Sequence, residues 1–351
     1  MQMQRAPAAR RVPPIALAIL VTASACSAGP AASMGASVQA SAAASPGPTQ
    51  IAHLSTGPVL RGSDLGGTSF AVLPGAFTIV DGIRHAFLVG FGNARGDHGG
   101  RHATSPDGLT WTLDDGDPLL GIDLELTDPG PIPSSVLRLA DGSWAMYLWG
   151  VPGPGRYDWR IWRATAPAAE GPWMVDPDAM LAAGAGAWDS AGVTFGSAVA
   201  TDDGFLMAYD GASLADPNTA SIGIATSTDG VKWAKRPEPI ITPGLCGAFD
   251  TRSVTQPRLV ATDGGFLIAY SGNGPAQTFA SIGLAWSTDG EQWSCAPGSP
   301  ILDGSDVPGS DGIHTVALAA TGNRVEVLVE SLVGGAGGSE LWLAELTEET
   351  P

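Results

Sequence analysis

The chain has 351 residues, of which 35 are acidic and 17 basic, so its formal net charge is −18. A surface this acidic repels nucleic acid and anionic lipid headgroups, and we therefore expect no nucleic-acid partner. The charge excludes these partners but identifies no substrate.

The N-terminus has the order of a bacterial lipoprotein signal peptide. A basic segment at residues 1–12 precedes the apolar run Ile15-Ala-Leu-Ala-Ile-Leu-Val21, and small residues then lead to Cys26. The run is too short to span a membrane as a helix. We predict a signal peptide over 1–25 and a lipidated Cys26 that anchors an extracytoplasmic protein to the cell membrane. Ordinary secretion, with cleavage after an Ala-x-Ala site, is the alternative.

The next segment has the composition of a flexible tether. Residues 27–50 are almost entirely Ser, Ala, Gly, Pro and Thr, and none is charged. Such a segment buries too little apolar surface to fold. We predict a disordered tether over 26–55 and one folded domain over 56–349.

The folded domain is a repeat array. Its copies close on tryptophans at positions 111, 173, 233 and 293, a period of 60 to 62 residues that indicates a repeat architecture. The three clear copies and one weaker copy are Ala103-Thr-Ser-Pro-Asp-Gly-Leu-Thr-Trp111, Ala225-Thr-Ser-Thr-Asp-Gly-Val-Lys-Trp233, Ala285-Trp-Ser-Thr-Asp-Gly-Glu-Gln-Trp293 and Ala164-Thr-Ala-Pro-Ala-Ala-Glu-Gly-Pro-Trp173.

Each repeat contains four short apolar runs separated by Gly, Asp, Asn or Pro, which is the pattern of strands and hairpins. Runs such as Phe205-Leu-Met-Ala-Tyr209 are apolar at successive positions, as in strands covered on both faces. We predict an all-β, five-bladed β-propeller of four-stranded antiparallel blades. The fifth repeat is degenerate, and we expect a strand from residues 56–72 to close the ring.

The recurring Ser-x-Asp-Gly-x-x-Trp segment is interpreted as scaffold, because catalytic groups normally occur once. Asp-Gly suits a type I′ hairpin turn, Ser and Asp side chains can bond turn amides, and Trp can anchor the hairpin between blades. Cys246 and Cys295 flank the fourth repeat, and in an exported protein the pair suggests a disulfide. Two free buried thiols are the alternative.

Three aspartates occupy nearly equivalent places ahead of successive inner strands: Asp128, Asp189 and Asp250. Inner strands of a propeller converge on the axis, so these carboxylates are candidates to face one funnel. Because they recur at one repeat position, a role in capping loops or bonding turn amides is the alternative.

The repeat pattern Trp-Asp-Ser-x-Gly-Val, Asp-Gly-Phe-x-Met-x-Tyr-x-Gly and Ile-Gly-x-Ala-Thr-Ser-x-Asp-Gly-x-x-Trp resembles the five-bladed propellers of the arabinanase, levansucrase and invertase superfamily of glycoside hydrolases. The resemblance covers about residues 70–349. It implies carbohydrate as the ligand and a pair of carboxylates acting at the sugar. On this basis Asp128, Asp189 and Asp250 are the predicted catalytic residues, with Trp188 and Phe249 lining the funnel.

Polar residues that do not recur are further candidates for substrate binding: Arg252, Arg258 and His314. The spacing Asp97-His98-x-x-x-His102 suggests a metal site, but a Gly-rich loop supports one poorly, so we predict no metal and no cofactor. The Asp-Gly turns also resemble the Asp-box of sialidases, although the spacing differs by one residue.

Two functions therefore remain open. The first is a glycosidase. The second is a non-catalytic surface propeller that binds glycans or docks another protein. The segment 70–80, where the family's first catalytic aspartate lies, contains no carboxylate, which favours the second function, whereas the carbohydrate chemistry of the family favours the first. In either case we expect a monomer.

Overall fold

The computed structural model divides the chain into residues 1–42 and a compact unit over residues 43–351. It describes residues 48–348 except 67–68, 70, 92–98, 117–125, 153–157, 186, 275–278 and 335–337, and for 48–49, 99, 126–131 and 348 it describes the backbone alone. The predicted signal peptide, Cys26 and residues 26–47 of the predicted tether lie outside the described residues.

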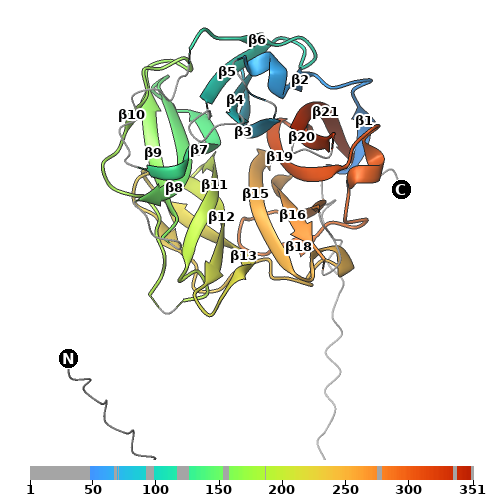
Figure 1. Ribbon diagram of the computed structural model, residues 1–351. Helices are drawn as coiled ribbons and strands as arrows, with labels where there is room; N and C mark the ends of the chain where they lie inside the picture. The colour runs from blue at the N-terminus through green and yellow to red at the C-terminus, as the bar shows by residue number, and fades with distance from the viewer. Residues whose placement is uncertain are drawn as a thin grey trace, which may run out of the picture. The chain divides into compact units, whose positions relative to one another are not determined.

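The compact unit is a five-bladed β-propeller, which confirms the predicted fold (Figure 1). Four blades follow one another along the chain, and each runs from an inner strand at the axis to a short outer strand. Their strands are, for blade 1, β3 (Ala71–Val80), β4 (Ile83–Phe91), β5 (Gly99–Ser105) and β6 (Thr112–Leu113); for blade 2, β7 (Leu126–Arg138), β8 (Trp144–Pro152), β9 (Arg160–Ala166) and β10 (Met174–Val175). For blade 3 they are β11 (Gly192–Thr201), β12 (Gly204–Ser213), β13 (Asp216–Ser227) and β14 (Ala234–Lys235); for blade 4, β15 (Ser253–Thr262), β16 (Gly265–Asn273), β17 (Ser281–Ser287) and β18 (Ser294–Cys295).

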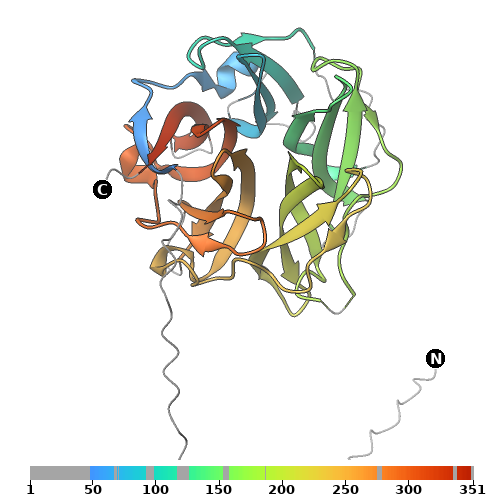
Figure 2. The ribbon, with the colours of Figure 1, turned by 180° about the vertical axis from the view of Figure 1, so that it is seen from behind.

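Blade 5 combines both ends of the domain. Its strands β19 (Gly312–Thr321), β20 (Arg324–Val333) and β21 (Gly338–Glu348) are completed by β1 (Pro48–Leu54), which pairs antiparallel with β21. Figure 2 shows the blue β1 beside the red β21 from behind. The closing strand therefore begins before residue 56, where we expected the propeller to start. Among the described residues of the expected range 56–72, the strand that pairs with β21 is the short β2 (Leu60–Arg61).

The second strands are covered on both faces, as their continuous apolar sequences predict. In β12, residues 206–212 are all buried, and they pack in clusters shared with the neighbouring blades. Three short 3₁₀ helices lie in connections: η1 (Gly62–Leu65), η2 (Ala248–Asp250) and η3 (Gly304–Asp306). Among the described residues, no helix is long and apolar enough to cross a membrane.

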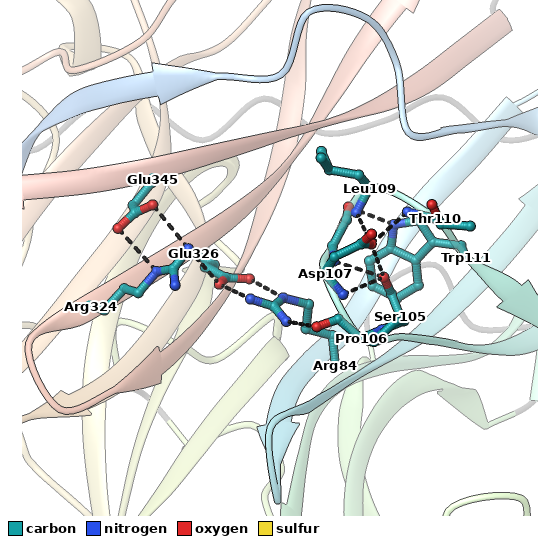
Figure 3. Close-up of polar contacts among 11 residues, drawn as sticks. Arg84, Ser105, Pro106, Asp107, Leu109, Thr110, Trp111, Arg324, Glu326 and Glu345 are labelled. Carbon is teal, nitrogen blue, oxygen red and sulfur yellow. Dashed lines mark hydrogen bonds and ion pairs between the residues drawn. The ribbon is translucent and has the colours of Figure 1, made fainter.

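The recurring turn is held by its own side chains, as predicted (Figure 3). Ser105 Oγ accepts from the Gly108 N–H at 2.7 Å, and Asp107 Oδ1 accepts from the amides of Leu109 and Thr110. These amides lower the pKa of the Asp107 carboxyl. The type I′ assignment is wrong: six residues separate β5 from β6, and of the Asp-Gly pair only Gly108 has a positive φ, of 76°.

An ion-pair network joins the first blade to the last (Figure 3). The Arg84 guanidinium is buried, donates to both carboxylate oxygens of Glu326 on β20, and donates to the Pro106 carbonyl at 2.7 Å. Arg324 then bonds Glu345 on β21. This network and β1 together close the ring.

Cys246 and Cys295 form a disulfide that encloses the fourth repeat. It links the loop before η2 to the short outer strand β18. The structure thus favours the predicted disulfide over two free thiols.

Candidate functional site

Asp189 and Asp250 are both buried, and each accepts hydrogen bonds from a loop amide and from a tyrosine hydroxyl on the second strand of its blade. Asp189 is 1% exposed, accepts from Lys235 Nζ at 2.6 Å, and also accepts from the Gly184 amide and the Tyr209 hydroxyl. Asp250 is 0% exposed and accepts from the Tyr270 hydroxyl at 2.9 Å and from two loop amides, those of Gly244 and Cys246. Both carboxylates therefore tie a loop to the second strand of their blade.

These bonds match the alternative role that the repeat position suggests, that of loop acceptor. The catalytic assignment of Asp189 and Asp250 stays a prediction. Asp128 lies in β7, but its side chain is outside the described residues.

Trp188 and Phe249 form the aromatic part of the same repeated unit. Trp188 stacks on Tyr209 with ring centroids 5.7 Å apart, and Phe249 stacks on Tyr270 at 6.1 Å. Glycines on the neighbouring strands make room for them: a Cβ at Gly223 would lie 2.6 Å from the Trp188 ring. We therefore assign both aromatic rings to packing within the blade.

Arg258 crosses the propeller axis. Its side chain is 2% exposed and donates to three backbone carbonyls on three other blades, at 2.7 Å to Val316, 2.9 Å to Ser134 and 3.3 Å to Pro74. Burial lowers the pKa of the Arg258 guanidinium to about 10, although the charges of Asp210 and Glu330 oppose the shift. It therefore stays protonated at neutral pH and ties the inner strands together.

A cavity of about 320 Å³ opens near the beginning of the inner strands of blades 3 and 4. It combines aromatic rings with hydroxyl, amide and carboxyl groups, which is the composition of a small-molecule site. Its lining residues are Trp149, Trp159, Gly192, Thr194, Phe195, Asp210, Gly211, Ala212, Pro217, Asn218, Ala220, Ser253, Thr255 and Gln256. We call this the axial cavity.

Bulges in the inner strands shape the axial cavity. Pairing of β11 with β12 shifts between Thr194 and Ser197, and pairing of β15 with β16 shifts between Thr255 and Arg258. At these bulges Phe195 and Gln256 have φ angles of 48° and 57°, which non-glycine residues seldom adopt. Backbone strain of this kind is typical of functional sites.

Asp210 is the buried carboxyl of the axial cavity. It accepts from the Thr194 hydroxyl and, at 2.9 Å, from the Gln256 backbone N–H. Burial raises the pKa of the Asp210 carboxyl, although these two hydrogen bonds and the charge of Arg258 oppose the shift. A carboxyl with this environment can exchange protons with a ligand closer to neutral pH than an exposed one.

Asp210 occupies a place in the second strand that differs in every blade. Pairing with the inner strand places Val89 opposite Leu73, Trp149 opposite Ile132, Asp210 opposite Thr194 and Ser271 opposite Thr255. In blade 5, Glu330 has the position in β20 that Asp210 has in β12. We call Val89, Trp149, Asp210, Ser271 and Glu330 the axial ring.

His314 and Glu330 form a polar pair beside the axial cavity. His314 Nδ1 lies 2.9 Å from Glu330 Oε2, and its Nε2 lies 3.3 Å from Gln256 Nε2. Burial disfavours protonation of His314, but the hydrogen bond and charge of Glu330 outweigh it and raise the pKa of the imidazole. The His314 side chain is 48% exposed, so this predicted binding residue can reach a ligand.

The structure brings together some of the predicted binding residues and adds others. His314 lies beside the cavity, Arg258 lies beneath it in the axis, and Arg252 is exposed just before β15. Sequence reasoning missed Trp149, Asp210 and Glu330. The signal was present in the aligned repeats, where Asp210 follows Tyr209 but Ser271 follows Tyr270.

No protein-family model matches the chain, and no curated protein matches it either. Solved structures do. One described as a glycoside hydrolase is 15% identical with a TM-score of 0.62, over 88% of this chain and 92% of that chain. A thermostable family-43 glycoside hydrolase is 15% identical with a TM-score of 0.62, over 86% and 96%. A β-1,2-mannobiose phosphorylase from Listeria innocua, in complex with β-1,2-mannobiose, is 14% identical with a TM-score of 0.63, over 84% and 96%. At these identities the likeness establishes a shared propeller fold.

Proposed function

We propose that this protein is an exported, lipid-anchored propeller that binds carbohydrate in the axial cavity. One observation carries the proposal: Trp149, Trp159 and Phe195 line a cavity that also holds the Asp210 carboxyl and several neutral polar groups. Aromatic faces can cover the apolar face of a sugar ring, while carboxyl and amide groups bond its hydroxyls. The fold shared with carbohydrate-active propellers supports the same ligand class.

Trp149 offers both an aromatic face and an unsatisfied donor. Its ring lies 4.8 Å from that of Phe195, and its buried indole N–H has no acceptor among the described residues. A buried donor without a partner is costly. Because this nitrogen has almost no accessible surface, a ligand hydroxyl satisfies it only after the neighbouring side chains shift.

Export and anchoring rest on the N-terminal sequence. The basic segment, the apolar run and Cys26 support processing as a lipoprotein, and the uncharged residues that follow provide a tether. The propeller would then hang from the outer surface of the cell membrane. Mass spectrometry of the membrane-extracted protein tests this, because an acylated Cys26 at the mature N-terminus is the expected product.

Hydrolysis of the bound sugar is a second candidate, favoured by Asp210 and Glu330. Asp210 has the raised pKa of a general acid, and Glu330 is a second buried carboxyl of the axial ring. In this mechanism Asp210 gives its proton to the leaving oxygen as the glycosidic bond breaks, and a water molecule that loses a proton to Glu330 forms the new bond to the sugar carbon. The sequence-predicted aspartates, Asp128, Asp189 and Asp250, remain the alternative catalytic set.

The test uses the compact unit, residues 43–351. A panel of oligosaccharides is assayed for binding to this protein and for release of sugar by it. We expect at least one ligand to bind and Trp149→Val to weaken that binding by about tenfold or more, because it removes an aromatic face worth about 1.4 kcal/mol or more. Release that Asp210→Ser abolishes would establish hydrolysis. A well-folded sample that neither binds nor releases any sugar would refute carbohydrate as the ligand.

A further inference from the structure

A polar cluster lies at the seam between blades 1 and 2, away from the axial cavity, and ranges from buried (His102) to exposed (Glu170). It contains His85 on β4, His102 on β5, Asp114 just after β6, and Glu170 in the turn before Trp173. One donor atom from each of His102, Asp114 and Glu170 lies within 4.8 Å of the other two. We call these four residues the seam cluster.

Backbone pairing positions His102 and Asp114. The Asp114 N–H donates to the His102 carbonyl at 2.9 Å, which continues the pairing of β5 with β6. Asp114 Oδ2 then lies 2.7 Å from His102 Nδ1. The other ring nitrogen, Nε2, lies 3.0 Å from His85 Nδ1. The two rings are stacked, with an angle of 12° between their planes. Two ring nitrogens from different strands therefore face each other.

The repeats show that this position does not need polar residues for folding. By strand pairing, His102 corresponds to Ile224 and Leu284, and His85 corresponds to Leu206 and Leu267. All four of these residues are buried and apolar. Replacing them with imidazoles costs desolvation energy, so blade 1 carries polar groups where packing alone favours aliphatic ones.

Blade 2 supplies an internal comparison. Its residues at the places of His102 and Asp114 are Arg163 and Asp176, which form an ion pair at 3.6 Å. Arg163 Nε and Asp176 Oδ2 are buried without a hydrogen-bond partner among the described residues, and Ala145 stands where blade 1 has His85. In blade 1 the corresponding pair, His102 and Asp114, has two further polar neighbours: Glu170 beside it, and His85 at the other ring nitrogen of His102.

We propose that the seam cluster is a binding site for a divalent transition-metal ion of the Zn²⁺ class. His102, Asp114 and Glu170 hold the ion, with His102 binding through Nδ1 beside Asp114. His85 faces the other ring nitrogen of His102, Nε2, where it orients the imidazole rather than binding the ion. Imidazole nitrogen together with carboxylate oxygen is a donor set that Zn²⁺ accepts, and tetrahedral ligand atoms about 2.0–2.1 Å from zinc lie roughly 3.3 Å apart. His102 Nδ1 and Asp114 Oδ2 lie 2.7 Å apart, so a small side-chain shift admits the ion between them.

The surroundings suit a metal ion. Phe87 contacts His102 with ring centroids 4.7 Å apart, and Trp144 contacts His85 at 5.0 Å. This apolar shell strengthens interactions with a charged ion inside it. Glu170 is exposed and gives the ion a route from solvent. Because the ligands come from two blades, a bound ion would clamp the seam between them.

The test is calorimetric titration of chelator-treated residues 43–351 with ZnCl₂. We expect one site, a higher melting temperature with zinc, and a loss of affinity of about 10–100-fold in Glu170→Gln and in Asp114→Asn. Glu170 is exposed, so its substitution leaves folding intact. The matched controls, Glu238→Gln and Asp115→Asn, remove exposed carboxylates outside the cluster and should change the affinity less than twofold.

A double variant, His85→Leu with His102→Ile, places the blade 3 residues in blade 1 and should fold without binding zinc. Three results would overturn the proposal: no zinc binding by the parent protein, equal binding by the double variant, or equal weakening by the control variants. The last two would mean adventitious binding to the acidic surface. Sugar binding plays no part in this assay, so its outcome is independent of the proposed function.

Discussion

The hairpin turns keep the same residues and bonds from blade to blade, whereas the axial ring has a different residue in each blade. In blades 1, 3 and 4 the turn has the same bond, from the glycine amide to the serine Oγ, at 2.7, 2.9 and 2.8 Å. In the axial ring the five blades have Val, Trp, Asp, Ser and Glu. Recurrence therefore marks the scaffold of this propeller, and variation marks the positions at which we propose that the ligand binds.

The largest expected effect concerns Arg258, which varies between blades yet supports the scaffold. Arg258→Met should lower the free energy of unfolding by about 3–5 kcal/mol, because three buried carbonyls lose their donor and two buried carboxyls lose a compensating charge. Urea denaturation measures the change. Arg252→Met, at an exposed site, is the matched control and should stay within about 0.5 kcal/mol of the parent. If the two variants are equally stable, Arg258 does not stabilise the scaffold.

A turn variant should affect stability alone. Ser227→Ala leaves the buried amide of Gly230 without its acceptor, so we expect a loss of about 1–2 kcal/mol in unfolding free energy and unchanged ligand affinity. Thermal denaturation and sugar binding are measured on the same sample. A large loss of sugar affinity in Ser227→Ala would contradict the view that the turns serve stability and the axial ring serves binding.

The smallest expected effect is the pH dependence of the His314–Glu330 pair. Because the pKa of His314 is raised in the folded protein, its stabilising contribution is complete below the ordinary histidine pKa of about 6.5 and is lost as pH rises through the folded value. The half-exposed pair should contribute less than about 1 kcal/mol. Denaturation of the parent protein and of His314→Gln from pH 5 to 9 tests this direction, because the difference in unfolding free energy between them should shrink as pH rises. A difference in unfolding free energy that grows with pH would contradict a raised pKa of His314.

The fold was predictable because the repeat recurs in sequence. Four tryptophans at a spacing of 60 to 62 residues and four apolar runs per repeat determine the blade number and strand count. The closing strand was not predictable in the same way, because β1 has the sequence Pro48-Thr-Gln-Ile-Ala-His-Leu54 and follows an uncharged low-complexity segment. Its pairing depends on β21, almost 300 residues away.

The site was harder to predict than the fold, because alignment draws attention to what recurs. Asp189 and Asp250 were selected for their shared position, yet that position binds loop amides in both blades. The position of Asp210 is occupied by Ser271 in the next blade, so only a comparison of the differences between repeats would have identified Asp210.

The seam cluster illustrates a second limit of sequence reasoning. Linear spacing paired His102 with His98, which lies outside the described residues. The antiparallel hairpin of β4 and β5 instead places His102 beside His85. Pairing between strands, which sequence spacing does not reveal, decides which polar side chains meet.

The most direct test of the central claim exchanges residues between blades. Trp149→Val and Asp210→Ser introduce the axial-ring residues of blades 1 and 4, while Trp188→Phe introduces the blade 4 residue at a recurring position. Each substituted residue already has a place in this propeller, so all three variants should fold. Titration with the tightest-binding sugar should show a loss of about tenfold or more in the two axial variants and less than twofold in Trp188→Phe. Unchanged affinity in both axial variants, or a loss confined to Trp188→Phe, would contradict the account.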